Sequence, residues 1–187
     1  MHHFSKWIGR FFVLSFLLSM PHGASATPIG IAGSSGAGAA HITPYRMALL
    51  WDLGPFAWED RSWQFRGVWE LSTAFWNSVP DRGRTIDKLS LATTGPQFRL
   101  QRAQPFQLGF QPYLEGGIGA SWLSETEVGG RRLGMHYQFE DRLGLGMRLG
   151  SKQRYDVNIR AMHYSNASLG KYNSGVNLLL LTVGYWN

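Results

Sequence analysis

The chain of 187 residues contains no cysteine. Disulfide bonds are therefore excluded, and an exported domain of this size must be stabilised by its fold or by a bilayer. Beyond residue 26 the sequence also lacks any run of roughly 18 consecutive apolar residues, which is the length that a transmembrane helix needs. If this chain crosses a membrane, helices do not carry it across.

Metal-binding and phosphate-binding patterns are absent too. His41 and His136 do not stand at ligand spacing with His163, so the sequence indicates no metal site. The glycine-rich segment 29–40 lacks the lysine and the helix of a phosphate-binding loop. We therefore expect no metal, no cofactor and no nucleic-acid partner.

The first 26 residues have the composition of a secretory signal peptide. Lys6 and Arg10 give a basic start, a short apolar core follows, and residues 24–26 form an A-x-A cleavage site. Cleavage would leave residues 27–187, or 187 − 26 = 161 residues, as one domain. The formal net charge would fall from +6 to +4, because both basic residues leave with the peptide. A modest basic excess suits an anionic surface such as phosphorylated lipid, although a solvated polar face explains it equally well.

Most of the remaining chain alternates between apolar and polar residues with a period of two. In segment 135–149, for example, Phe139 and Leu143 fall on one side, whereas Glu140 and Arg142 fall on the other. This alternation is typical of strands with one apolar face, and turns rich in Gly and Pro separate the segments. We expect eight strands, at about residues 29–40, 45–52, 65–76, 86–100, 106–118, 135–149, 153–164 and 176–186.

The length of these segments, with their glycines and aromatic residues, predicts an all-β fold: an eight-stranded antiparallel transmembrane β-barrel after a cleaved signal peptide. Tryptophans such as Trp51, Trp76 and Trp122 would supply aromatic girdles at the membrane surfaces. The alternative is a secreted lipocalin-like barrel with the apolar set inside. Charged residues such as Glu115 and Arg148 belong mostly to the other set, and in a small membrane barrel they would fill the lumen as pairs.

Strand parity predicts the topology of such a barrel. The termini of an outer-membrane barrel are periplasmic and its periplasmic turns are short, so the odd-numbered strands run outward. The seventh strand, 153–164, would then end at the cell surface. The outer leaflet at this surface is where lipopolysaccharide is found.

The end of the seventh strand carries the residues that point to catalysis. His163 and Ser165 stand two residues apart, so in a strand their side chains share one face with the apolar Val157 and Ile159. A histidine beside a serine can activate the hydroxyl as a nucleophile, although such a pair is more often structural. Asn166 follows directly, and its side-chain amide or backbone N–H could stabilise an oxyanion. Because this face would contact lipid, the pattern favours an esterase with a lipid substrate.

Three segments resemble the PagL-type lipid A 3-O-deacylases of Gram-negative outer membranes: 112–119, 139–144 and 160–167, the last with the sequence RAMHYSNA. The resemblance implies an eight-stranded barrel and a serine hydrolase that removes the ester-linked acyl chain at the 3-position of lipid A. It also implies site residues. These are Ser165 as the nucleophile, His163 as the base and Asn166 as the oxyanion-hole residue.

One position departs from the family pattern. The best-known members carry a glutamate fourteen residues after the histidine, as the acid of the triad, and this chain has Asn177 there. An asparagine can orient a histidine, but it lacks the charge that stabilises the imidazolium. In a serine protease the corresponding Asp-to-Asn change costs about 10⁴ in rate.

Asp141 is the expected substitute acid, because it lies on the otherwise apolar face of its strand, where a carboxylate is costly. An odd-length turn near residues 150–152 would bring it opposite or diagonal to His163, within cross-strand reach. The alternative is that Asp141 pairs with Arg142 or another basic neighbour.

We therefore expect an outer-membrane serine esterase of a Gram-negative bacterium that hydrolyses the 3-hydroxyacyl ester at the 3-position of lipid A in lipopolysaccharide. Two alternatives stay open: a non-catalytic structural or adhesive barrel, and a phospholipase or acyltransferase that acts on another lipid. The expected partners are lipid A and the bilayer, with Arg131, Arg132 and Lys171 as candidates to meet lipid phosphates. The sequence leaves open whether the barrel forms a homodimer.

Overall fold

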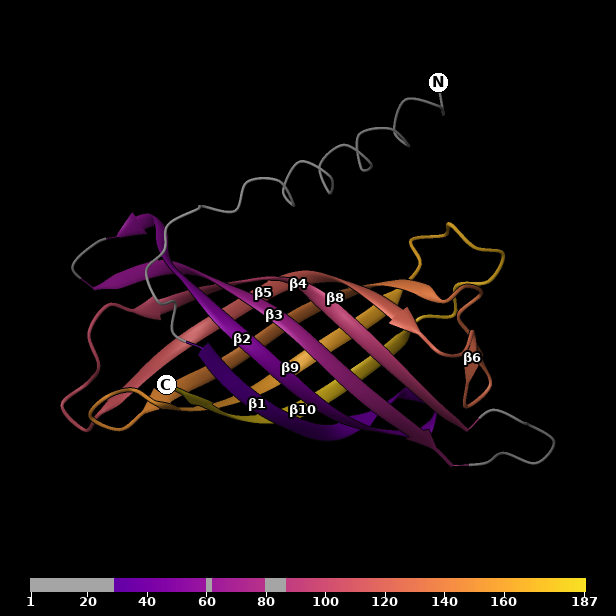
Figure 1. Cartoon of the computed structure of the whole chain (residues 1–187), viewed down its shortest axis with the longest axis horizontal. Helices are drawn as coiled ribbons and strands as arrows, with labels where there is room; N and C mark the ends of the chain where they lie inside the picture. Colours follow the sequence, from indigo (N-terminus) through magenta and orange to yellow (C-terminus); the bar gives the residue numbers. More distant parts are fainter. Residues whose placement is uncertain (1–28, 60–61, 80–86) are drawn as a thin grey trace, which may run out of the picture.

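The computed structural model describes residues 29–59, 62–79 and 87–187, and they form a closed antiparallel barrel (Figure 1). The barrel order is β1-β10-β9-β8-β5-β4-β3-β2. Its strands are β1 (Ile29–Gly38), β2 (Ile42–Glu59), β3 (Trp63–Ser78), β4 (Lys88–Arg102), β5 (Phe110–Leu123), β8 (Tyr137–Leu149), β9 (Tyr155–Ser165) and β10 (Val176–Trp186). The predicted eight-stranded barrel is therefore confirmed, whereas the signal peptide predicted for residues 1–26 lies outside the described residues.

The first and last strands close the barrel. β1 pairs with β10 in a continuous register from Gly30 opposite Trp186 to Gly38 opposite Leu178. A 3₁₀ turn, η1 (Ala39–His41), joins β1 to β2. A small two-stranded hairpin, β6 (Glu127–Val128) and β7 (Arg131–Arg132), lies in the connection between β5 and β8 and pairs only with itself.

Both ends of the described chain lie at one end of the barrel (Figure 1). The opposite end, called the distal end from here on, carries the β6–β7 hairpin and the connection 166–175 between β9 and β10. Because β9 is the seventh barrel strand, it runs toward this distal end and finishes there at Ser165. The seventh barrel strand therefore runs away from the end that holds the termini, as predicted from the sequence.

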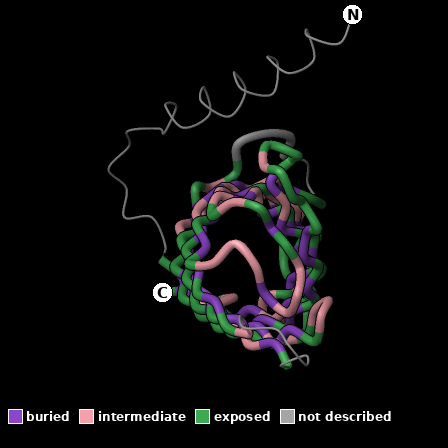
Figure 2. Tube along the Cα trace, turned by 90° about the vertical axis from the view of Figure 1, so that its right-hand side faces the viewer, coloured by how far each residue is buried: buried purple, intermediate pink, exposed green. Residues whose placement is uncertain are grey.

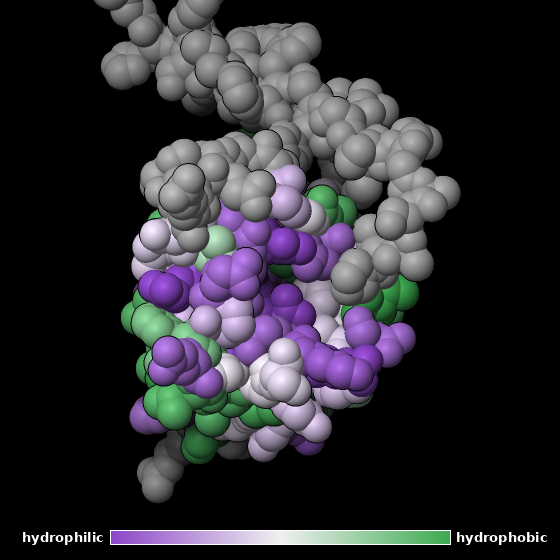
Figure 3. All heavy atoms as spheres, turned by 90° about the vertical axis from the view of Figure 1, so that its left-hand side faces the viewer, coloured by the Kyte–Doolittle hydropathy of each residue, from purple (hydrophilic) through white to green (hydrophobic). Residues whose placement is uncertain are grey.

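Along most of the barrel wall an exposed, mainly apolar face alternates with a buried face that holds the charged residues. In β9 Ile159 is 57% exposed, whereas its neighbours Asn158 and Arg160 are buried. Figure 2 shows the same alternation of exposed and buried residues along the strands. In Figure 3, seen from the end of the termini, hydrophilic residues gather on the end face and hydrophobic ones lie along the flanks. The apolar set is therefore outside, which excludes the lipocalin-like alternative.

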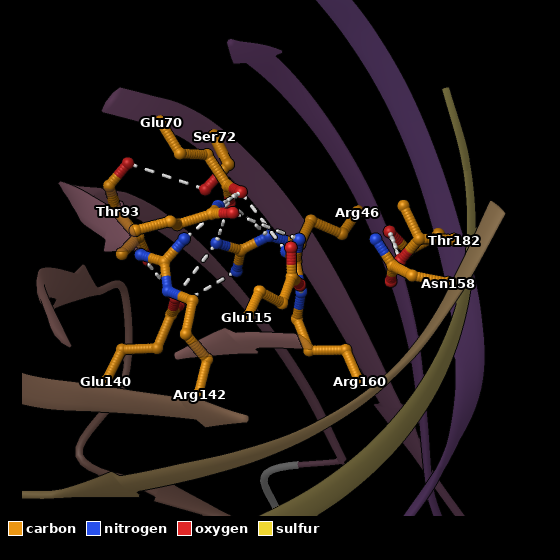
Figure 4. Close-up of polar contacts among 12 residues, drawn as sticks. Arg46, Glu70, Ser72, Thr93, Glu115, Glu140, Arg142, Asn158, Arg160 and Thr182 are labelled. Carbon is orange, nitrogen blue, oxygen red and sulfur yellow. Dashed lines mark hydrogen bonds and ion pairs between the residues drawn. The ribbon is translucent and has the colours of Figure 1, made fainter. Parts of the chain in front are cut away.

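A belt of ion pairs fills the middle of the barrel interior. Arg46 reaches Glu70 at 2.5 Å and Glu140 at 2.9 Å, and Arg160 reaches Glu115 at 2.7 Å (Figure 4). Among the described residues, four buried arginines pair with four of the buried acids: Arg46, Arg99, Arg142 and Arg160 with Glu70, Glu115, Glu140 and Asp156. The fifth buried acid, Asp52, pairs with the less buried Arg66 at 2.8 Å. Because the pairs compensate one another, the interior carries charge without a net excess, which a barrel of this size requires.

Apolar residues close the interior on either side of this belt. Toward the distal end, a cluster includes Trp76, Leu123 and Val176 together with Val128 and Leu133 of the hairpin region. The prediction that Trp76 belongs to an aromatic girdle is wrong, because its side chain is 1% exposed and packs inside the barrel. Toward the termini, Leu50, Val68 and Trp186 form a smaller cluster. Among the described residues, no helix is long and apolar enough to cross a membrane.

Two strands differ from their predicted bounds by more than two residues at an end. The second strand was predicted to end at residue 52, but β2 continues to Glu59 through register shifts at Gly54 and beyond. These bulges interrupt the alternation without ending the pairing. The fifth strand was predicted over 106–118, but β5 spans 110–123, because Phe106 and Gly109 close a turn through the Gly109 N–H and the Phe106 carbonyl at 2.8 Å.

Candidate functional site

The site lies on the lipid-facing wall at the distal end of β9. His163 is exposed and Ser165 is half-buried, and both side chains point outward with Ala161, as the alternation of the strand requires. Their backbone positions lie about 6.6 Å apart along the strand, a span that an imidazole leaning along the strand can cover. No hydrogen bond joins Ser165 to His163 in this part of the described chain, which is common for a catalytic pair before substrate binds.

Asn177 holds the ring of His163. It stands directly opposite His163 in the β9–β10 pairing, and the His163 Nδ1–H donates to Asn177 Oδ1 at 2.5 Å. Because Nδ1 carries the proton in this hydrogen bond, Nε2 of the neutral imidazole is left as the acceptor. The position at which the family has its acid thus provides the orientation that a general base needs, but no charge.

Asp141 stands on the other side of His163. The β8–β9 register places Asp141 directly opposite His163, so the predicted juxtaposition is confirmed. The alternative partner Arg142 is wrong, because Arg142 points into the barrel and contacts Glu70 at 3.1 Å and Glu140 at 3.0 Å. Cross-strand neighbours have Cβ atoms about 4.5–5.5 Å apart, so the Asp141 carboxylate can lie within Coulombic range of the imidazole.

Asn166 is buried behind the site rather than displayed in it. Its side-chain amide donates to the carbonyls of Leu133 and Tyr172, each at 2.7 Å, and its backbone N–H donates to Asn173 Oδ1 at 3.0 Å. The side-chain amide is therefore committed to holding the loop, and the backbone N–H could meet an oxyanion only by exchanging its hydrogen bond with Asn173. The oxyanion role of Asn166 stays a prediction.

Sequence reasoning missed Asn173, which accepts that N–H, because only the fold of the 166–175 connection brings the two asparagines together. The remaining histidine of this region has a structural role. His136 Nδ1 lies 2.7 Å from the Leu123 carbonyl, and its ring stacks on Trp122.

Seven of the eight barrel strands, from β2 to β10, match a known family. The model of the family described as "Lipid A 3-O-deacylase (PagL)" matches residues 42–186. The chain belongs to the PagL family. Its members include the lipid A deacylase PagL of Pseudomonas aeruginosa, which is 34% identical over 159 residues, or 85% of this chain and 87% of that protein. The lipid A deacylase PagL of Bordetella bronchiseptica is 33% identical over 131 residues, or 66% of this chain and 68% of that protein.

A solved PagL structure has the same architecture. The crystal structure of the outer membrane enzyme PagL matches with a TM-score of 0.73 at 28% identity, and the match covers 83% of this chain and 98% of that one. The predicted PagL resemblance and the predicted outer-membrane barrel are thus confirmed. The roles of Ser165, His163, Asn177, Asp141 and Asn166 stay predictions, because family membership does not test them.

Proposed function

We propose that this PagL-family barrel is a lipid A 3-O-deacylase, a serine esterase in which Ser165 is the nucleophile and His163 the base. The observation that carries the proposal is the His163–Asn177 hydrogen bond on the lipid-facing wall, beside Ser165. It fixes the imidazole so that the free Nε2 is available to a serine hydroxyl. An enzyme of soluble substrates would have no reason to build this arrangement on its membrane-facing surface.

The wall below His163 suits an acyl chain. Ala161 lies in register between Leu143 of β8 and Leu179 of β10, so one small side chain stands between two larger ones. Leu143 is 60% and Leu179 58% exposed, so both are free to contact lipid. A lipid that diffuses laterally in the membrane could lay its ester-linked chain over Ala161, with the ester at the level of His163 and Ser165.

The proposed reaction has two steps. The Ser165 hydroxyl oxygen attacks the ester carbonyl carbon while His163 Nε2 takes the hydroxyl proton. The tetrahedral intermediate collapses, the sugar oxygen leaves with the proton from Nε2, and the acyl group stays on Ser165. Water then attacks the acyl-enzyme, its proton passes to Nε2, and Ser165 leaves with that proton as the free fatty acid departs.

Two neighbours of His163 together replace the acid of the triad. Asn177 orients the ring through Nδ1, and Asp141 supplies the negative charge that stabilises the imidazolium from across the strand. The oxyanion would accept a hydrogen bond from the Asn166 backbone N–H. In the structure this N–H donates to the Asn173 side-chain oxygen, and the oxyanion would replace that oxygen as the acceptor. For the choice of the 3-position of lipid A, the support is the chain's membership of the PagL family.

The test uses purified barrel, lipid A and product mass spectrometry in water enriched in ¹⁸O. Wild-type protein should release one 3-hydroxy fatty acid with one ¹⁸O atom and leave lipid A without the acyl chain at its 3-position. Ser165→Ala should release none, whereas Ser168→Ala, in the exposed start of the loop, should behave as the wild type. Release from a phospholipid instead would identify another lipid substrate, and intact lipid in every case would indicate a non-catalytic barrel.

A further inference from the structure

The β6–β7 hairpin is anchored in the barrel and holds the loop behind the site. Val128 and Leu133 are fully buried in the distal apolar cluster. From this anchor the hairpin region reaches the 166–175 connection twice through its backbone. The Arg132 carbonyl accepts the Ser174 N–H at 3.0 Å, and the Leu133 carbonyl accepts the Asn166 amide at 2.7 Å.

Arg131 adds a third contact from the same hairpin. Its Nε donates to the Gly175 carbonyl at 2.6 Å, and its Nη2 donates to the Ser174 carbonyl at 2.5 Å. Two parallel donors on two consecutive carbonyls are what a rigid guanidinium fork provides, and a lysine cannot reproduce them. The guanidinium is therefore committed to the backbone of this connection.

Gly175 lies beside the imidazole of His163. It adopts φ +60°, and a Cβ built on it would lie 3.1 Å from His163 Cε1 and 3.6 Å from Nε2. A side chain at this position would crowd the edge of the ring that carries the free nitrogen, so Gly175 leaves that edge the space it occupies. A shift of Gly175 would change the space into which Nε2 can turn, while Asn177 still held Nδ1.

We infer that Arg131 is a positioning residue for the proposed reaction: it fixes Ser174 and Gly175 so that His163 Nε2 stays aimed at Ser165. The inference rests on the proposed function. Asn177 and Arg131 then restrain the imidazole from its two edges, one directly and one through the backbone. A misplacement of about 1 Å at a reacting group can cost on the order of a hundredfold in rate.

The neighbouring Arg132 provides a charge-matched control. Its guanidinium lies over the Tyr172 ring at 4.8 Å and only approaches Glu127, at 3.9 Å, so its side chain does not reach the loop carbonyls. Arg131→Ala and Arg132→Ala remove the same charge from the same hairpin. Only the first should change how His163 is held.

The kinetic test compares Arg131→Ala, Arg131→Lys and Arg132→Ala, each confirmed as a folded barrel by heat-modifiable mobility. Arg131→Ala should lower kcat by about ten- to a hundredfold with little change in KM. Arg131→Lys should recover only part of that loss. Arg132→Ala removes the same charge, and with it any contact of Arg132 with a lipid phosphate, so its KM can rise, but it should lower kcat far less than Arg131→Ala does. If both alanine variants raise KM alike and neither lowers kcat, the arginines bind the lipid phosphates and the inference is wrong.

A second readout does not depend on turnover. The imidazole ¹⁵N resonances of His163 should shift in Arg131→Ala and stay in place in Arg132→Ala. If the wild type proves inactive on lipid A, the proposed function fails, but these resonances still decide the inference. Unchanged His163 resonances in Arg131→Ala would overturn it whatever the activity.

Discussion

Replacing Asp141 by asparagine removes one negative charge beside His163 and preserves the size of the side chain. Cross-strand pairing puts the Cβ atoms of Asp141 and His163 about 5 Å apart, and we take this as the separation of the two charges. At that distance and an effective dielectric of about 20, Coulomb's law gives about 3 kcal/mol between the carboxylate and an imidazolium. Both side chains are exposed, so screening reduces this to about half. We therefore predict that Asp141→Asn lowers kcat about tenfold.

The assay measures initial rates of fatty acid release from lipid A in detergent micelles under saturating substrate. Glu125→Gln, which removes a charge from the connection between β5 and β8, serves as the charge control and should leave kcat unchanged. The loss should appear in kcat rather than KM, because the imidazolium forms only along the reaction. The reasoning is refuted if Asp141→Asn turns over at the wild-type rate while Asn177→Ala abolishes turnover.

Two further predictions concern the site and the interior. Asn177→Asp keeps the shape of the side chain and makes its hydrogen bond to His163 charge-assisted. The imidazolium should then be about 1 kcal/mol more stable, and kcat should rise roughly fivefold. A lower kcat would show that orientation of the imidazole alone limits the rate. Glu70→Gln leaves Arg46, Arg142 and Arg160 short of a buried partner and should lower the free energy of unfolding in denaturant by about 3–5 kcal/mol. Glu127→Gln, at an exposed contact, should change it by less than about 1 kcal/mol, and equal effects would contradict the account of the interior.

The part of the site built on regular strands was predictable from the sequence. A period of two placed His163 and Ser165 on the lipid-facing side, and an odd-length turn after β8 placed Asp141 opposite His163. Both inferences depend only on local geometry that every strand and hairpin obeys. Asn177 was named through the family resemblance alone, and the pairing of β9 with β10 places it opposite His163.

The part built on the connections was not predictable. Asn166 was expected to stabilise an oxyanion through its side-chain amide or its backbone N–H. The side-chain amide instead donates to the Leu133 and Tyr172 carbonyls, because the β6–β7 hairpin packs against the loop. Arg131 contacts Gly175, which lies 44 positions later in the sequence, and no sequence pattern around either residue predicts this contact. Irregular backbone has no period from which a contact can be inferred. For the same reason the continuation of β2 beyond residue 52 was not predicted, because its bulges interrupt the period of two.

The central claim is that His163 activates Ser165 on the lipid-facing wall. Labelling of outer membranes with a long-chain fluorophosphonate, followed by mass analysis of the intact barrel and its peptides, tests it most directly. The account predicts one adduct per wild-type chain, located on Ser165, and none in Ser165→Ala. In His163→Gln the labelling rate should fall by at least about a hundredfold. An adduct elsewhere, or labelling of Ser165 at the same rate without His163, would contradict the account.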